Sequence, residues 1–116
     1  MKEIYEMDVY RLSEELSDMI WDAFDKWTVK AQRTIGYQIV RSSDSIAANL
    51  AEGYGRYSGA DKKRFYYYAR GSLEETKAWL RKGIRRELIS SEETDKYKKT
   101  IDELGPKLNA FIKKTK

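Results

Sequence analysis

Residues 38–56 read QIVRSSDSIAANLAEGYGR, and the spacing of their apolar and small residues decides the fold class. One stripe steps by three and four residues, and since an α-helix has 3.6 residues per turn, its members share one helix face. The stripe is Ile35, Ile39, Ser42, Ile46, Leu50 and Gly53. The sequence Gly53-Tyr54-Gly55 at its end predicts a left-handed C-cap and a turn.

Three further helices are predicted from stripes of the same period. The first stripe is Val9, Leu12, Leu16, Met19, Ala23 and Trp27, with Ile20 and Phe24 beside it; the third is Phe65, Ala69, Ser72, Leu73, Thr76, Leu80 and Ile84; the fourth is Tyr97, Ile101, Leu104, Leu108 and Phe111. Their expected N-terminal signals are Asp8 and Ser58 as N-caps and a capping box of Ser90 with Glu93.

No segment alternates with the period of two that a β-strand needs. Pro106 lies within the fourth predicted helix, where we expect a kink or a break into two segments. Residues 1–116 therefore predict a single all-α domain, an antiparallel up-down-up-down four-helix bundle.

The composition excludes most catalytic chemistry. The 116 residues include no cysteine and no histidine, which rules out disulfides, thiolate metal sites, thiol nucleophiles and a Ser-His-Asp triad. Glu52 and Glu75 are the one conceivable acid–base pair, and we expect no enzymatic activity, no cofactor and no metal site. Because no apolar run is long enough to span a membrane and the N-terminus is too acidic for a signal peptide, we expect a cytoplasmic protein.

Charge is divided unevenly along the chain. Residues 1–28 hold three basic and eight acidic residues, a net charge of −5, whereas the whole chain carries +4. The excess of basic residues is concentrated in residues 56–88. Two explanations stay open: the acidic helix neutralises the basic one, within one chain or between subunits, or the basic surface is free to attract phosphates.

Small and polar residues line the second predicted helix where it is expected to face the third. Serines and alanines between residues 42 and 51, opposite Ala69, Gly71 and Ser72, are predicted to let two helix backbones approach closely. A polar row runs beside the apolar stripe, and we interpret it as a structural network that fixes helix register or a subunit contact, with a ligand site as the alternative. With its expected partners on the next helix, the row is Arg41, Ser45, Asn49, Glu52, Ser72 and Glu75.

A nucleic-acid-binding surface is the second candidate site. The predicted phosphate contacts are Arg64, Arg81, Lys82, Arg85 and Arg86. Tyrosines near these cations are candidates for stacking on unpaired bases, namely Tyr54, Tyr57 and Tyr67, together with Tyr66. The alternatives are a solvated or acid-paired basic face and tyrosines at an oligomer interface.

The blocks SIAANLAEGYGR (residues 45–56) and FYYYARGSLEE (residues 65–75) resemble a bacterial family named for the intervening sequences of 23S rRNA genes, also called the S23 ribosomal protein family. The resemblance extends over nearly the whole chain. It implies four antiparallel helices, often assembled as a ring-shaped homopentamer, without known enzymatic activity. Relatives include the accessory protein of diversity-generating retroelements, which binds nucleic acid and a reverse transcriptase. The chain departs from the family pattern at Asp44, where an apolar residue is usual, and at Thr76-Lys77.

These observations together predict a non-enzymatic, homo-oligomeric accessory protein, a pentamer by resemblance, that binds RNA or DNA phosphates with little base specificity. A reverse transcriptase or another protein is a further expected partner. The alternative is a protein-interaction scaffold, in which the acidic first helix of one subunit docks on the basic third helix of a neighbour.

Overall fold

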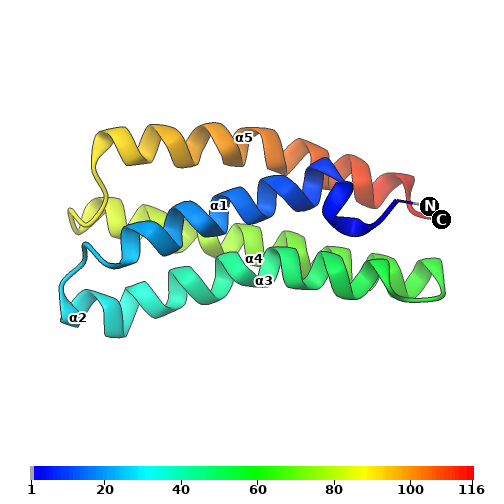
Figure 1. Cartoon of the computed structure of the whole chain (residues 1–116), viewed down its shortest axis with the longest axis horizontal. Coiled ribbons are helices and arrows are strands. Elements are labelled where there is room, and N and C mark those ends of the chain that lie inside the picture. The colour runs from blue at the N-terminus through cyan, green and yellow to red at the C-terminus, as the bar shows by residue number, and fades with distance from the viewer. Residues whose placement is uncertain (1) are drawn as a thin grey trace.

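The computed structural model describes residues 2–116, in which four long helices and no β-strand are found (Figure 1). The long helices are α1 (Asp8–Phe24), α3 (Tyr37–Tyr54), α4 (Gly59–Arg85) and α5 (Ser91–Lys114). The shorter elements are a 3-10 helix, η1 (Ile4–Glu6), the single turn α2 (Val29–Ala31) and a π-helical segment, η2 (Gln32–Gly36). The predicted all-α class is confirmed.

Each long helix packs against two others. Both α1 and α4 pack against α3 and α5, whereas α1 and α4 have little contact with one another and lie diagonally across the bundle. Consecutive long helices run in opposite directions along a molecule 44 Å long (Figure 1). We call the end with both termini and the α3–α4 turn (residues 55–58) the terminal end, and the end with α2 and the α4–α5 turn (residues 86–90) the α2 end (Figure 1). The predicted antiparallel four-helix bundle is confirmed.

The predicted stripes supply most of the core. The leucine and isoleucine side chains without any exposed surface come from α1, α3 and α5, namely Leu16, Ile20, Ile39, Ile46, Leu50, Leu104 and Leu108. In α4 the pattern differs from the prediction, because Tyr66 is buried while Ile84 is 40% exposed. The hypothesis that Tyr66 stacks on nucleobases is therefore wrong: its ring packs on that of Phe111, with the centroids 4.8 Å apart.

Two of the predicted helix starts are confirmed. The hydroxyl oxygen of Ser58 accepts a hydrogen bond from the backbone N–H of Asp61 at 3.1 Å and caps α4. Ser90 and Glu93 form the capping box of α5, in which each side chain accepts from the backbone N–H of the other residue. The prediction for Asp8 is wrong, because Asp8 is the first helical residue of α1 and its carboxylate forms an ion pair with Arg11.

Two predicted irregularities are corrected. Gly55 has a φ of −82°, and its N–H continues the helical pattern by bonding to the carbonyl of Ala51, so the left-handed cap does not form. Helix α5 runs unbroken through Pro106, so the predicted break is wrong, while the kink expected as its alternative stays a prediction. Since Pro106 lies on the exposed side of α5, the carbonyl that loses its helical partner can bond to water instead.

The α3–α4 seam is the most extensive helix contact, and small residues make it close. A Cβ atom built on Gly53 would lie 2.7 Å from Cε1 of the buried Tyr66 ring, so only glycine fits at this crossing. Further along the seam, the hydroxyl oxygens of Ser42 and Thr76 lie 2.9 Å apart and form a buried hydrogen bond. The close approach predicted from the small residues occurs at these two points.

Candidate functional site

Four exposed cations gather at the C-terminal end of α4, at the α2 end of the bundle. These residues, Arg81, Lys82, Arg85 and Arg86, are called the basic cluster. The partial negative charge of a helix C-terminus stabilises cations at such a position. Elsewhere on α4, Arg64 and Lys77 form ion pairs, but within residues 2–116 no ion pair involves the basic cluster. Its charge is therefore not neutralised by a carboxylate in the described part of the chain.

The acidic residues of α1 do not neutralise the basic cluster in the same chain. Because α1 lies diagonally opposite α4, the two helices share no substantial contact. Neutralisation within one chain is thus excluded as the explanation of the charge asymmetry. Neutralisation between subunits and binding of phosphates both stay open.

The basic cluster consists of two pairs that point in different directions. Arg81 and Arg85, one helical turn apart, line a groove between α4 and α5. Lys82 and Arg86 lie about 100° further round the helix, outside the groove. The ammonium group of Lys82 lies 5.3 Å from the ring centroid of Trp79. The two pairs can therefore contact two different ligands.

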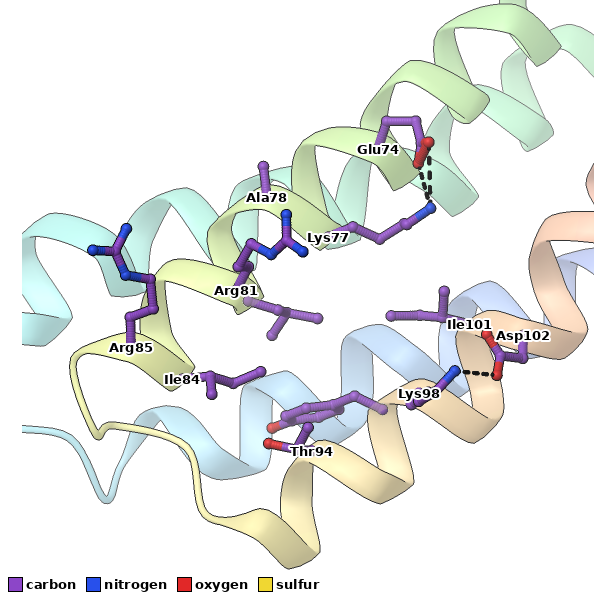
Figure 2. Close-up of a pocket in the computed structure, with 12 residues that line it drawn as sticks. Glu74, Lys77, Ala78, Arg81, Ile84, Arg85, Thr94, Lys98, Ile101 and Asp102 are labelled. Atoms are coloured by element: carbon purple, nitrogen blue, oxygen red, sulfur yellow. Dashed lines mark hydrogen bonds and ion pairs between the residues drawn. The ribbon is translucent and has the colours of Figure 1, made fainter.

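The groove between α4 and α5 has an apolar floor and a cationic rim (Figure 2). Its volume is about 790 Å³, and its floor includes the apolar side chains Leu80, Ile84, Tyr97 and Ile101. Burial raises the pKa of Tyr97 to about 12. Arginines lie on the α4 side of the rim, as Figure 2 shows. Such a groove fits a ligand with an apolar centre and anionic flanks.

Two lysines on the rim of the groove were missed by the sequence analysis. Lys77 forms an ion pair with Glu74 at 2.8 Å, and Lys98 forms one with Asp102 at 2.8 Å (Figure 2). The hydrogen bond from Lys98 to Asp102 raises the pKa of the lysine. Their spacing of three and four residues from a carboxylate is a signal that sequence alone contains. Since both lysines are already paired, Arg81 and Arg85 supply the free positive charge of the rim.

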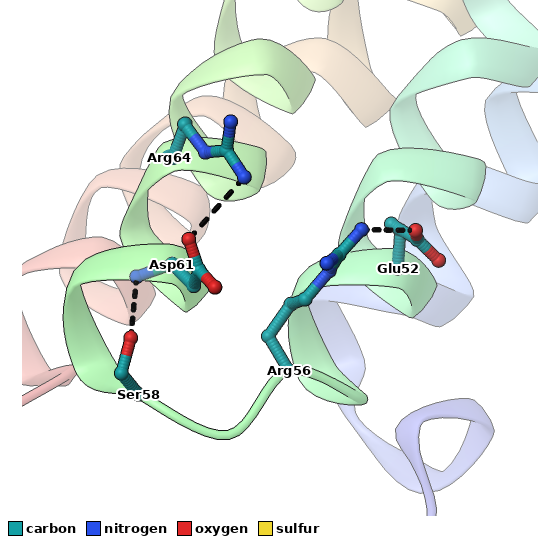
Figure 3. Close-up of polar contacts among 5 residues, drawn as sticks. All are labelled: Glu52, Arg56, Ser58, Asp61 and Arg64. Carbon is teal, nitrogen blue, oxygen red and sulfur yellow. Dashed lines mark hydrogen bonds and ion pairs between the residues drawn. The ribbon is translucent and has the colours of Figure 1, made fainter.

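Arg64 belongs to a different group of residues, at the terminal end. Its guanidinium pairs with Asp61 at 3.2 Å, and Arg56 pairs with Glu52 at 2.7 Å (Figure 3). The guanidinium carbons of Arg64 and Arg56 lie 5.0 and 4.6 Å from the ring centroid of Phe65. This arrangement ties the α3–α4 turn together, and it separates Arg64 from the basic cluster by about 25 Å of helix.

The three remaining candidate tyrosines lie towards the terminal end. Tyr54 is half-buried, and the ammonium of Lys62 lies 5.5 Å from its ring centroid. Tyr57 is fully exposed in the α3–α4 turn. Tyr67 is 47% exposed, and the guanidinium of Arg70 lies 4.9 Å from its ring. The structure therefore does not bring these rings together with the basic cluster in one chain.

The polar row is also dispersed. Asn49 donates a hydrogen bond to the backbone carbonyl of Ser45 at 2.9 Å. Glu52 accepts one from Arg56 in the α3–α4 turn, and Glu75 accepts one from Trp79, one turn further along α4. Between residues 2 and 116, no hydrogen bond joins any two of the six side chains of the predicted network. The Ser42–Thr76 contact links α3 to α4 instead. A role of the row in a subunit contact stays a prediction.

The carboxylates do not converge on a common point. In the part of the chain that the structure describes, no three Asp or Glu side chains are placed to hold a metal ion. Partial burial and the charges of Glu14 and Asp18 raise the pKa of Asp44, which lies on α3 beside α1.

Within residues 2–116, no helix is both long and apolar enough to cross a membrane.

Comparisons with known proteins agree with this architecture. Residues 5–110 match the family described as 23S rRNA-intervening sequence protein. A crystal structure of a protein of unknown function from the S23 ribosomal protein family of Bacteroides thetaiotaomicron is similar, with 31% sequence identity and a TM-score of 0.80. The similarity covers 90% of this chain and 98% of that chain. The comparison with curated proteins gives no match. The chain therefore belongs to the 23S rRNA-intervening sequence protein family.

Proposed function

We propose that the chain is a non-enzymatic, homo-oligomeric accessory protein whose basic cluster binds the phosphates of RNA or DNA. The observation that carries the proposal is that four exposed cations at one end of α4 have no carboxylate partner within residues 2–116. Unpaired Lys and Arg side chains on an exposed face bind phosphates and release the counterions condensed on the nucleic acid. Contacts of this kind carry no information about base sequence, which agrees with binding of low specificity.

Lys82 and Arg86 are the preferred phosphate contacts, because they lie outside the groove and face solvent. Arg64 lies 18 residues from Lys82, which is five full turns of helix, so the two share one face about 27 Å apart. An extended polyanion lying along α4 reaches both positions, whereas a small phosphate compound reaches only one. The exposed ring of Tyr67, between them along α4, is available for stacking on an unpaired base.

Two further parts of the proposal concern protein partners. One part is that the chain forms a homo-oligomer, with five subunits by resemblance. The other is that a reverse transcriptase is a partner. Each of these two parts can be correct or wrong whether or not the basic cluster binds phosphates. The alternative function is a protein-interaction scaffold without nucleic-acid binding. It is favoured by the groove between α4 and α5, whose exposed Ile84 lies between cations.

A salt titration tests the binding of phosphates. Fluorescence anisotropy with labelled single-stranded RNA and duplex DNA should show an affinity that falls log-linearly between about 50 and about 200 mM salt. The double variant Lys82→Glu/Arg86→Glu should weaken binding at least about tenfold, because two phosphate contacts become repulsive. The matched control is Lys113→Glu/Lys114→Glu, which changes the net charge equally on exposed residues of α5 at the terminal end.

The control variant should bind nearly as well as the wild type. Equal losses in both double variants would show that only net charge matters, and absence of binding at low salt would refute the role of the basic cluster. If the protein binds no nucleic acid at low salt but still forms a stable oligomer, the protein-interaction scaffold becomes the favoured function.

A further inference from the structure

An acidic patch surrounds an exposed tryptophan on α1. The other two tryptophans are used within the fold: the Nε1–H of Trp27 donates to the carbonyl of Leu88, and that of Trp79 donates to Glu75. Trp21 is 64% exposed, and its indole N–H has no hydrogen-bond partner within residues 2–116. We call Trp21 with the exposed residues Asp18, Asp22 and Asp25 the acidic knob.

The charges of the acidic knob are unfavourable for α1 itself. Helix α1 ends at Phe24, with Asp25 as its C-cap and no basic residue in its last turn. The carboxylates of Asp22 and Asp25 face the negative end of the helix dipole, where cations are the stabilising choice. None of the three aspartates forms an ion pair within residues 2–116. A local rule broken without compensation in the same chain is typical of a functional surface.

The groove between α4 and α5 has the opposite character. Its centre is apolar, with Ile84 40% exposed, and Arg81 and Arg85 on its rim have no carboxylate partner in the described residues. Its volume of about 790 Å³ is ample for an indole side chain. An apolar knob with unpaired acids around it and an apolar groove with two unpaired arginines on its α4 side are complementary in charge, and the groove has room for the knob.

The acidic knob cannot reach the groove of its own chain. It lies on α1, which packs between α3 and α5, whereas α4 lies diagonally across the bundle. We infer that Trp21 of one copy inserts into the α4–α5 groove of a second copy, with Asp18, Asp22 and Asp25 around Arg81 and Arg85. The inference rests on the homo-oligomeric part of the proposed function and does not depend on binding of nucleic acid.

This contact joins two different surfaces of the same chain. Every copy then offers one free knob and one free groove, so the association is head-to-tail and extends until a ring closes. Lys82 and Arg86 lie outside the groove and stay exposed in such an assembly. Assembly and phosphate binding therefore use different cations of α4 and can be separated by substitution.

The experiment measures molar mass in solution by size-exclusion chromatography with light scattering, over a range of concentrations. The wild type should be oligomeric. Two charge-reversed variants, Arg81→Glu/Arg85→Glu and Asp18→Lys/Asp22→Lys/Asp25→Lys, should each be monomeric, because knob and groove then carry the same sign. Mixed together, they should associate again, since each knob now meets a groove of opposite charge. The variant Trp21→Ala should also lose the oligomer.

Matched variants make the outcome decisive. Lys82→Glu/Arg86→Glu reverses the same number of charges in the same part of α4 but outside the groove, and it should keep the wild-type mass. All the reversed residues are exposed, and circular dichroism verifies that each variant remains helical. A monomeric wild type, an oligomer unaffected by the reversals, or dissociation without recovery on mixing would each refute the knob-in-groove contact. Such a failure leaves the salt titration of nucleic-acid binding untouched.

Discussion

Helix α4 is packed closely against α3 but leaves a groove against α5. On the α3 side, Gly53 and Ser42 are small enough that the backbones approach and a buried hydrogen bond forms to Thr76. On the α5 side, the seam is closed only towards the terminal end, where the rings of Tyr66 and Phe111 are in contact. Towards the α2 end it opens into the groove.

The difference shows how side-chain chemistry along one helix produces both a core and a surface site. Lys77, Arg81 and Lys98 occupy the positions beside the open part of the α4–α5 seam. Their charged ends stay in water, so they flank the seam without filling it. Ile84 and Ile101 then lie at the floor of a groove instead of in a closed core.

The largest expected effect compares two isoleucines across the two seams. Ile46→Ala, on α3, removes a side chain with no exposed surface and should lower the free energy of unfolding by about 2–5 kcal/mol. Ile84→Ala, in the groove, removes one that is 40% exposed and should cost less than about 1 kcal/mol. Urea unfolding at low protein concentration measures both. Similar losses would show that the α4–α5 seam is as closed as the core.

The next largest effect is the change in stability when a helical glycine is replaced by alanine, and we expect opposite signs at two positions. Gly53→Ala brings a Cβ to within 2.7 Å of the Tyr66 ring and 3.0 Å of the Lys62 carbonyl, and overpacking should cost about 1–3 kcal/mol. Gly71→Ala places its Cβ where no atom lies within 4 Å, so helix propensity should stabilise the chain by up to about 1 kcal/mol. Thermal unfolding of both variants gives the signs.

A stabilising Gly53→Ala would contradict the close approach of α3 and α4 at that point. A destabilising Gly71→Ala, measured at a concentration where the protein is monomeric, would show that this exposed face of α4 is constrained by a contact that the fold does not contain.

The smallest effect concerns Asp44, beside the acids of α1. Partial burial and the neighbouring charges raise its folded pKa above 3.8, so the folded state holds its proton more tightly than the unfolded state does. The contribution of Asp44 to stability therefore falls as the pH rises from the unfolded pKa of 3.8 through the higher folded pKa. Asp44→Asn should stabilise the protein at pH 7 by less than about 0.5 kcal/mol, because most of the side chain is exposed and its burial is only partial. The gain should vanish below the unfolded pKa, and a gain that persists there would refute the electrostatic cause.

Much of the fold could be predicted because helix periodicity and capping are local. The stripe from Ile35 to Gly53 and the caps at Ser58 and Ser90 depend on residues a few positions apart. The role of Gly53 could not be predicted in the same way. Glycine is required at position 53 because the Tyr66 ring of the next helix leaves no space for a Cβ, and not because of the backbone φ. The solvent exposure that lets Pro106 stay helical is also a tertiary property.

The candidate site was predicted in composition but not in arrangement. The run of cations from Arg81 to Arg86 is visible in the sequence, and the structure places it at one end of α4. The division into two pairs depends on which helix flanks each side of α4, and that follows from the topology of the whole bundle. The tyrosines expected beside these cations lie towards the terminal end, because even Tyr67 is 14 residues from Arg81 on α4, about 21 Å along the helix.

The division of the basic cluster is tested most directly by sedimentation velocity with labelled single-stranded RNA at about 50 mM salt, where phosphate contacts are strong. We predict that Lys82→Glu/Arg86→Glu keeps the sedimentation coefficient of the wild-type oligomer and loses the RNA, whereas Arg81→Glu/Arg85→Glu sediments as a monomer. The same loss of RNA and of assembly in both variants would contradict separate roles for the two pairs of cations.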